Sequence, residues 1–172
     1  MSRLVDRVKT GLRAQQEAYA VHADDERPLG GYLVAITGFT VLTTGVGLLT
    51  AAKGTQRLSV RDVVLLGAAT HKLARIVSKD AVASPIRAPF TSYKGPAGPG
   101  EVMEEVRGEG TRHAVGELLT CPFCLSPWVA TLLLGGIVVA PKITHNVMTV
   151  FSAVTVADGL QFAYSALEKT AD

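Results

Sequence analysis

Several features that mark well-known classes of protein are scarce or missing in this sequence. Only 2 of its 172 residues are cysteines, and because both lie in one CxxC they cannot build a disulfide framework. The formal net charge of +2 lacks the basic footprint of a nucleic-acid binder. There is no internal repeat and no recognised glycine-rich phosphate loop. The sequence therefore predicts no nucleic-acid partner and no cofactor, whether haem, quinone or nucleotide.

Hydrophobic residues, by contrast, are abundant and concentrated. They make up 48% of the chain, and the mean hydropathy is +0.28, which is more apolar than most soluble domains. The run from Gly31 to Ala52 holds no charge and, at about 1.5 Å per residue, crosses roughly 30 Å of hydrocarbon. It starts too late and runs too long for a cleaved signal peptide. We interpret it as a permanent membrane anchor.

Three further segments have the length of a membrane helix, although residues 61–79 are apolar only in their first half. The length of the chain suits one domain. We therefore predict an all-α fold, a small multi-pass membrane helix bundle with about four transmembrane helices. The expected organisation is an N-terminal arm at 1–29, spans at about 31–52, 61–79, 122–140 and 146–167, and a loop at 80–121.

The N-terminal arm has a helical pattern of its own. Apolar and amphipathic side chains recur at helical spacing, which predicts a short amphipathic helix. They are Leu4, Val8, Leu12, Gln15 and Tyr19. Two placements fit this helix: it rests on the inner leaflet of the membrane through its apolar face, or it stays in solvent.

The predicted loop is rich in residues that interrupt helices. Prolines and glycines crowd its first half and exclude a continuous helix there. They are Pro85, Pro89, Gly95, Pro96, Gly98, Pro99 and Gly100. A short helix is expected from Thr111 to Leu119, where it would lead the chain to Cys121.

Positive charges near the span ends predict the orientation. The side of a membrane protein that is richer in lysine and arginine is normally cytoplasmic, which places both termini and the loop in the cytoplasm. The richer side holds Arg27, Lys79, Arg87, Lys94, Arg107, Arg112 and Lys169, and the poorer side holds Lys53, Arg57, Arg61 and Lys142.

The segment TCPFCLSPW, residues 120–128, opens the third predicted span. A helix with Thr120 as its N-cap would place Pro122 at a tolerated early position. A helix with Ser126 as its N-cap would be too short to cross the hydrocarbon. We expect CPFC to form a first turn, Pro127 to tighten or kink it, and Trp128 to anchor the helix at the headgroup level.

Three roles are open for Cys121 and Cys124. The thiols can be structural, packed in a turn. They can form a redox pair, because a helix N-terminus stabilises a thiolate and a reversible disulfide can follow. They can also bind a metal, with His113 or a second chain supplying the ligands that a tetrahedral zinc site still needs.

Polar residues within the predicted spans suggest a second site. Asp158 lies near the middle of the last span, where an ionisable side chain is costly unless it finds a partner. Arg75 and His71 lie at a similar depth on the second span and share one helical stripe. We expect Asp158 to pair with Arg75 or His71, with Gln161 joining the same network. The pair would act as glue between two helices or as part of a proton or ion relay.

Two blocks of the sequence resemble a known family. The segments HKLARIVSKDAVASPIRAPF and GPAGPGEVMEEVRGEGTRHAVGELLTCPFCLSPWVA are similar to bacterial membrane proteins grouped as the domain of unknown function 1360. The resemblance covers about residues 60–165 and implies a bacterial or phage-borne protein that crosses the cell membrane several times, without supplying an activity. The residues that carry it are Arg75, Asp80, Ile86, Arg87, Pro89, Phe90, Glu117, Cys121, Pro122, Cys124 and Trp128.

Charged residues of these blocks alternate in sign around the predicted cytoplasmic mouth. We expect the cluster of Arg75, Asp80, Arg87 and Glu117 to hold the loop against the CPFC turn, so that Arg87→Ala or Asp80→Ala would loosen the loop. The leading functional prediction is a non-enzymatic scaffold or accessory protein, acting in the lipid bilayer through other membrane proteins or further copies of itself. The alternative is a membrane-embedded dithiol oxidoreductase or thiol sensor, with Cys121 as the more exposed nucleophile.

Overall fold

A computed structural model describes residues 2–19, 27–54 and 57–171 and shows a mainly helical chain with one small β-hairpin. The predicted all-α fold is confirmed in part, because the chain is mostly helical but also forms a two-stranded hairpin that was not predicted. The five long helices are α1 (Ser2–Tyr19), α2 (Leu29–Lys53), α3 (Val60–Lys79), α6 (Pro122–Val139) and α7 (Pro141–Ala171). The elements between α3 and α6 are η2 (Ala81–Ala83), α4 (Ser84–Arg87), β1 (Thr91–Gly98), β2 (Glu101–Val106) and α5 (Gly110–Thr120).

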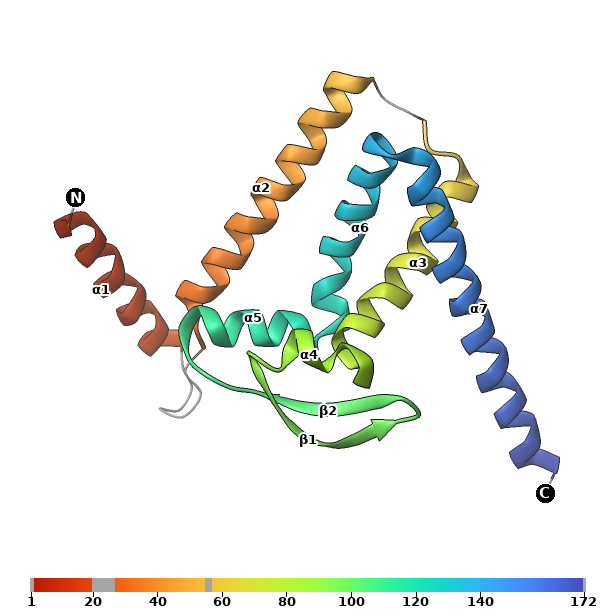
Figure 1. Ribbon diagram of the computed structural model, residues 1–172. Helices are drawn as coiled ribbons and strands as arrows, with labels where there is room; N and C mark the ends of the chain where they lie inside the picture. The colour runs from red at the N-terminus through yellow and green to blue at the C-terminus, as the bar shows by residue number, and fades with distance from the viewer. Residues whose placement is uncertain (1, 20–26, 55–56, 172) are drawn as a thin grey trace.

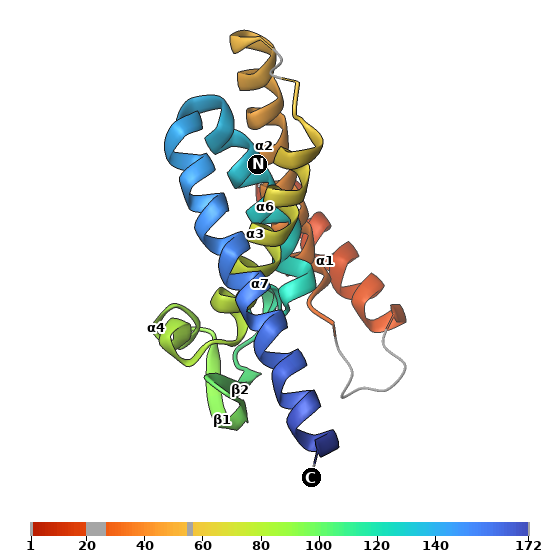
Figure 2. The ribbon, with the colours of Figure 1, turned by 90° about the vertical axis from the view of Figure 1, so that its right-hand side faces the viewer.

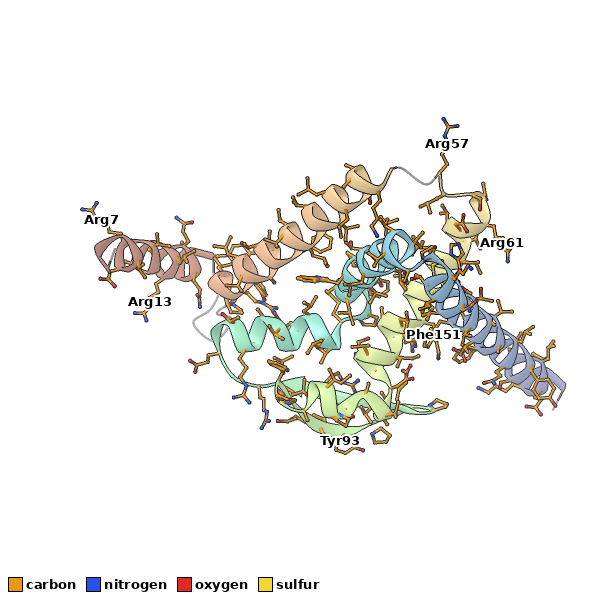
Figure 3. The ribbon with its side chains drawn as sticks, turned by 45° about the horizontal axis from the view of Figure 1, so that its top comes forward. Arg7, Arg13, Arg57, Arg61, Tyr93 and Phe151 are labelled. Carbon is orange, nitrogen blue, oxygen red and sulfur yellow. A yellow bond between two sulfur atoms is a disulfide. The ribbon has the colours of Figure 1, made fainter. Side chains whose placement is uncertain are left out.

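Helices α2, α3, α6 and α7 traverse the molecule in alternating directions. The connections from α2 to α3 and from α6 to α7 lie at one end, and the hairpin, α4 and α5 lie at the other, as Figure 1 shows. Figure 3 shows Arg57 and Arg61 at the first of these ends, directed away from the bundle. The segments 29–53, 122–139 and 141–170 are long and apolar enough to cross a membrane.

The second predicted span needs a correction. Residues 61–79 do form a helix, α3, but it is not among the helices that are apolar enough to cross a membrane. Its first half supplies Leu65, Leu66 and Ala69 to the core, whereas its second half carries charged residues that pair with other elements. The structure thus contains three helices apolar enough to cross a membrane, with α3 as an amphipathic helix packed against two of them, α6 and α7.

The core lies between α3, α6 and α7. Its most deeply buried side chains are Ala69, Leu133, Ile137 and Met148. Two hydroxyls also join α7 to α3: Ser152 Oγ donates to the Leu65 carbonyl, and Thr155 Oγ1 donates to the Ala68 carbonyl, each at 2.9 Å. Both pairs have the same sequence offset, so α3 and α7 run parallel in a fixed register.

Helix α2 packs on α6 through glycines and aromatic rings. The rings of Phe39 and Trp128 lie 5.3 Å apart, and a Cβ at Gly38 would lie 3.3 Å from the Trp128 ring. Trp128 is therefore half-buried between two helices, and its predicted role as an anchor at the headgroup level stays a prediction.

Helix α1 lies beside the bundle, and the hairpin projects on the opposite side in Figure 2. The predicted amphipathic helix is thus formed over Ser2–Tyr19. Its Val5 and Val8 side chains are exposed, while the side chain of Leu4 lies outside the described residues. The placement of α1 on a membrane stays a prediction.

The middle of the predicted loop, residues 91–106, is a two-stranded antiparallel hairpin. Its register runs from Thr91 opposite Val106 to Gly98 opposite Glu101, with two irregularities in β1. The turn uses Gly100 at φ 76°, a conformation that glycine adopts at no steric cost. Prolines break helices but are tolerated at the edge of a sheet, which is why the composition excluded a helix without excluding this hairpin.

The predicted helix at Thr111–Leu119 is confirmed as α5, which covers the hairpin. The two elements approach closely at Gly116, where a Cβ would lie 2.6 Å from Val106 Cγ1. Arg107 Nη2 donates to the Ala88 carbonyl at 2.7 Å, and Arg112 Nε donates to the Pro89 carbonyl at 2.9 Å. We call α4, the β1–β2 hairpin and α5 together the platform.

Candidate functional site

Arg87 is the central residue of the platform, and its side chain is completely buried. Its guanidinium binds Glu104 in a bidentate manner, with Nε 2.6 Å from Oε2 and Nη2 3.2 Å from Oε1. Nη1 also donates to the Val77 carbonyl at 2.7 Å, and Nη2 donates to the Asp80 carbonyl at 3.0 Å. These carbonyls lie at the C-terminal end of α3, where helices leave acceptors unsatisfied. One side chain therefore joins α3, α4 and β2.

Glu104 completes this buried network. Its carboxylate also accepts hydrogen bonds from Thr91 Oγ1 at 3.1 Å and from Ser84 Oγ at 3.2 Å. Burial alone would raise the pKa of Glu104, but the hydrogen bonds and charge of Arg87, helped by the two hydroxyls, hold this pKa below its ordinary value. Glu104 is therefore an anion whose acceptors are well satisfied, as a buried charge requires.

The local sequence explains how Arg87 reaches this position. Asp80 leaves α3 in an extended conformation, and Pro85 falls in the first turn of α4, where a missing backbone N–H costs nothing. The single turn of α4 then directs Arg87 back under the end of α3. Arg87 thus fastens the hairpin to the end of α3, while the role predicted for it, holding the loop against the CPFC turn, stays a prediction.

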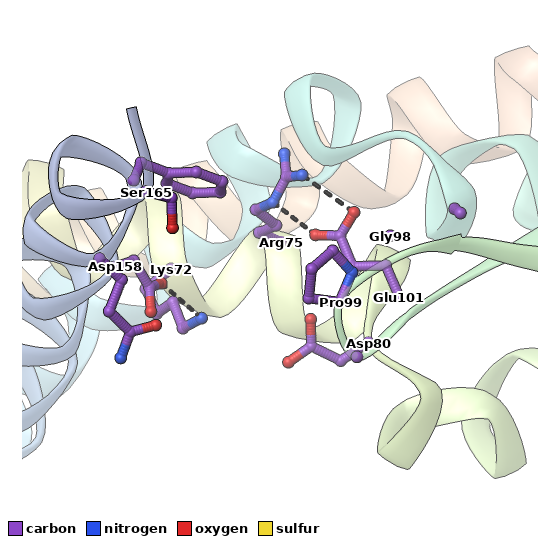
Figure 4. Close-up of a pocket in the computed structure, with 12 residues that line it drawn as sticks. Lys72, Arg75, Asp80, Gly98, Pro99, Glu101, Asp158 and Ser165 are labelled. Carbon is purple, nitrogen blue, oxygen red and sulfur yellow. Dashed lines mark hydrogen bonds and ion pairs between the residues drawn. The ribbon is translucent and has the colours of Figure 1, made fainter. Parts of the chain in front are cut away.

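A second feature, which we call the polar cleft, lies between α3, the hairpin turn and α7 (Figure 4). It is open and has a volume of about 570 Å³. Two ion pairs cross it: Lys72 Nζ lies 2.8 Å from Asp158 Oδ2, and Arg75 Nε lies 2.7 Å from Glu101 Oε1. The lining residues are Lys72, Arg75, Asp80, Ala97, Gly98, Pro99, Gly100, Glu101, Asp158, Gln161, Phe162 and Ser165.

The predicted partner of Asp158 was wrong. Asp158 pairs with Lys72 rather than with Arg75 or His71. The offset of 87 residues between α3 and α7 puts His71 at the height of Asp158, but the His71 side chain is exposed and the neighbouring Lys72 makes the contact. Arg75, one turn further along α3, reaches across to Glu101 of the hairpin instead. Helix α7 begins at Pro141 rather than at residue 146 and ends at Ala171, so Asp158 lies close to the middle of this helix.

The predicted polar cluster is thus divided among three places. Arg75, Asp80, Asp158 and Gln161 do line one cleft. Arg87 lies next to them but is buried, and it contacts Asp80 only through the backbone carbonyl. His71 is exposed and is not among the residues that line the cleft. Glu117 lies apart from this cluster.

Glu117 instead joins α5 to the start of α2. Its carboxylate accepts from Arg27 Nη1 at 2.9 Å and from the Tyr32 hydroxyl at 2.5 Å, and His113 Nε2 lies 3.5 Å away. Beside it runs a groove of about 560 Å³, mostly apolar, which has Tyr32, Ile36 and Leu118 in its lining and reaches Cys121 and Cys124. Glu117 therefore lines the same groove as the cysteine pair.

CPFC forms the first turn of α6, as expected, but the N-cap is Cys121 itself. Its sulfur accepts from the Cys124 amide at 3.2 Å, whereas Thr120 is the last residue of α5. The two sulfurs are in disulfide contact, with Cα atoms 5.2 Å apart. Cys124 is exposed and Cys121 is half-buried, which corrects the prediction that Cys121 is the more exposed thiol.

The structure also bears on where the helix starts and on a metal site at the two cysteines. Pro127 lies inside α6 without ending it, so the helix does not use the alternative start at Ser126. Among the residues that the structure describes, no three His, Cys, Asp or Glu side chains gather as a metal site would need. His113 instead accompanies Glu117 and the Gly108 carbonyl, which lies 3.1 Å from Nδ1.

Four residues that build these sites were not predicted: Tyr32, Lys72, Glu101 and Glu104. The alternation of β2, in which Val102, Glu104 and Val106 are half-buried and Met103 and Glu105 are exposed, is the signal that could have found Glu104. Lys72 gave no such signal, because its partner depends on how α3 and α7 pack.

These observations define a class of protein: a helical bundle with three apolar helices that can cross a membrane and a small ion-paired platform at one end. Residues 65–164 match the family described as protein of unknown function (DUF1360). This is more than half of the chain, and the chain belongs to this family. No solved structure matches it.

A curated protein is also similar in part. "Sporulation protein YjcA" of Bacillus subtilis (strain 168) is 35% identical over 75 residues, which are 42% of this chain and 64% of that protein. The chain therefore spans somewhat less than two thirds of the length of this relative.

Proposed function

We propose that this chain is an integral membrane accessory protein of a bacterial cell membrane, which presents the platform to a protein partner at the cytoplasmic face. The observation that carries the proposal is the buried Arg87–Glu104 network. Removing two such charges from water is costly, and here the result is a fixed orientation of an otherwise exposed hairpin. A rigid, exposed surface suits recognition, because less conformational entropy is lost on binding.

The distribution of positive charge supports the cytoplasmic orientation. The residues counted for the richer side, such as Arg107 and Arg112, lie on or near the platform, and those of the poorer side, such as Arg57 and Arg61, lie at the opposite end. The positive-inside rule then favours a cytoplasmic platform. The name of the curated relative assigns that protein to a cellular process rather than to a chemical reaction, which suits an accessory role here too.

Photocrosslinking in living cells tests this function. Tyr93 on the hairpin and Tyr164 on α7 are matched aromatic positions, 65% and 64% exposed, and each is replaced by a photoreactive phenylalanine. We expect a protein adduct from Tyr93 that disappears when Arg87→Met is added, and no equivalent adduct from Tyr164. Equal adducts from both positions, or an adduct from Tyr93 that survives Arg87→Met, would contradict platform recognition.

A dithiol function is the second candidate, favoured by the contact between the sulfurs of Cys121 and Cys124 and by the groove beside them. In this function the pair would accept two electrons and two protons from a substrate dithiol, opening its own disulfide and closing that of the substrate.

Thiol labelling in intact cells tests both the orientation and the dithiol role. With a membrane-impermeant maleimide, labelling only after permeabilisation and without reduction indicates free cytoplasmic thiols and favours the accessory role. Labelling that requires reduction indicates a disulfide and favours the dithiol role. If reduction alone, without permeabilisation, allows labelling, the proposed orientation is wrong.

A further inference from the structure

The polar cleft lies at a defined height along the apolar helices. At about 1.5 Å per residue, Asp158 lies about 26 Å along α7 from Pro141, and the start of α6 lies at nearly the same distance from that end. The hydrocarbon of a bilayer is about 30 Å thick. If these helices cross the membrane, the cleft lies where the acyl chains of one leaflet end and its headgroups begin.

The cleft contains charges of both signs, and some of its hydrogen-bond donors and acceptors have no partner among the described residues. Within the described part of the chain, Arg75 Nη1 makes no hydrogen bond, since Glu101 occupies Nε and Nη2. The Asp80 carboxylate has no hydrogen-bond or ion-pair partner among the described residues, and Lys72 uses only one contact, to Asp158. The cleft therefore offers donors on one wall and a carboxylate acceptor on another (Figure 4).

We propose that the polar cleft binds the headgroup of a phospholipid that carries a phosphate and a primary ammonium, a phosphoethanolamine headgroup. Arg75 Nη1 and Lys72 Nζ donate to the phosphate, and Asp80 accepts from the ammonium. Phe162, which borders the cleft and is 72% exposed, lies where it would contact the acyl chains. The inference depends on the membrane placement in the proposed function, but not on a protein partner.

The charges also select among headgroups. Lys72 and Arg75 face three carboxylates, those of Asp80, Glu101 and Asp158, so the lining carries a net charge of −1. This charge disfavours a headgroup whose only charge is a phosphate, such as phosphatidylglycerol. A quaternary ammonium is usually held by several aromatic rings, whereas Phe162 is the one aromatic residue of this lining. A primary ammonium, which can donate hydrogen bonds to a carboxylate, fits best.

Native mass spectrometry of the full chain in detergent tests the proposal. The chain is titrated with phosphatidylethanolamine, phosphatidylglycerol or phosphatidylcholine of the same acyl length. We expect phosphatidylethanolamine to be retained best. Asp80→Asn, which removes one charge-assisted contact, should lower its affinity on the order of tenfold and shift the preference towards phosphatidylglycerol. Asp6→Asn on α1, the same chemical change at an exposed residue away from the cleft, should change neither value.

Three results would overturn the proposal. They are equal or stronger retention of phosphatidylglycerol by the unaltered chain, an Asp80→Asn variant that keeps the original preference, and binding of free phosphoethanolamine as tight as that of the lipid. Circular dichroism shows whether each variant retains its helices. If the chain is recovered in the membrane fraction and crosslinks through Tyr93 but retains no lipid, this inference alone is refuted. If the chain is absent from the membrane fraction, the proposed function is refuted.

Discussion

Replacing Arg87 with methionine removes the guanidinium that joins α3, α4 and β2 while keeping an unbranched side chain in its place. Glu104, whose side chain is 6% exposed, would then be a buried carboxylate without its cation. The carbonyls of Val77 and Asp80 would lose their donor as well. Removing one partner of a buried ion pair costs about 3–5 kcal/mol. Because the network lies inside the platform, we expect this cost to appear as local opening of the hairpin.

Hydrogen exchange measured by mass spectrometry reports such local opening. The informative peptide covers residues 88–107 and includes the Arg107 amide, which donates to the Phe90 carbonyl at 2.9 Å. At about 1.4 kcal/mol for each factor of ten, Arg87→Met should accelerate exchange in this peptide roughly a hundredfold to several thousandfold. Peptides from the α3–α6–α7 core should change far less, because their hydrogen bonds do not involve the platform.

Lys94→Met provides the matched control. Lys94 pairs with Glu105 on the same hairpin, but both side chains are largely exposed, and exposed pairs contribute little to stability. A second variant, Arg87→Met with Glu104→Leu, removes the buried unpaired charge and should recover part of the protection, although the two carbonyls and the Ser84 hydroxyl still lose the bonds that Arg87 and Glu104 made with them. The reasoning would be refuted if Arg87→Met exchanged no faster than Lys94→Met.

Three further predictions concern separate features. Because Arg87 holds the pKa of Glu104 below its ordinary value of 4.5, its contribution to stability is complete above pH 4.5 and is lost as the pH falls through the lower folded pKa. Hairpin exchange should therefore accelerate only in acid, after correction for the intrinsic rate, and this acid step should be absent in the double variant. Gly116→Ala should lower the thermal stability of the platform by about 1–3 kcal/mol, because its Cβ would lie 2.6 Å from Val106 Cγ1; Gly67→Ala, which meets no atom within 4 Å, should raise helix stability by about 1 kcal/mol. Thr70→Val should stabilise the protein by about 1 kcal/mol in thermal unfolding, since Thr70 Oγ1 is a buried atom without a hydrogen-bond partner in the described structure, and an unchanged or lower midpoint would contradict this.

The features predicted correctly from the sequence depend on short segments of the chain. The uncharged run from Gly31 to Ala52 lies within α2, and the first turn at CPFC and the helix after Thr111 follow from proline and glycine positions that act within a few residues. Each of these patterns acts through neighbouring residues of the same segment. They need no knowledge of how distant parts of the chain meet.

The features that were wrong or missed depend on how distant segments meet. The partner of Asp158 was wrong because depth along the helices does not say which face of α3 meets α7. His71 lies at the height of Asp158, yet it is exposed and Lys72 makes the contact. Glu104 was missed because its role requires pairing of β1 with β2 and a turn at α4 that brings Arg87 beneath α3. Pairing of this kind is set by tertiary packing, which the local pattern constrains only weakly.

The second half of α3 is polar because its charged side chains pair with other elements. Lys72 joins it to α7, Arg75 joins it to the hairpin turn, and the Val77 carbonyl receives the Arg87 guanidinium. An apolar helix in this position would satisfy the hydrocarbon but would leave Asp158 and Glu101 without these partners, whereas the Val77 carbonyl is a backbone group and would remain available to Arg87. Both ion pairs cross the polar cleft, and the contacts of Arg75 and of the Val77 carbonyl also reach the platform. A displacement of α3 relative to α7 would therefore move the cleft and the platform together. Helix α3 is therefore the element through which occupancy of the cleft would reach the exposed hairpin.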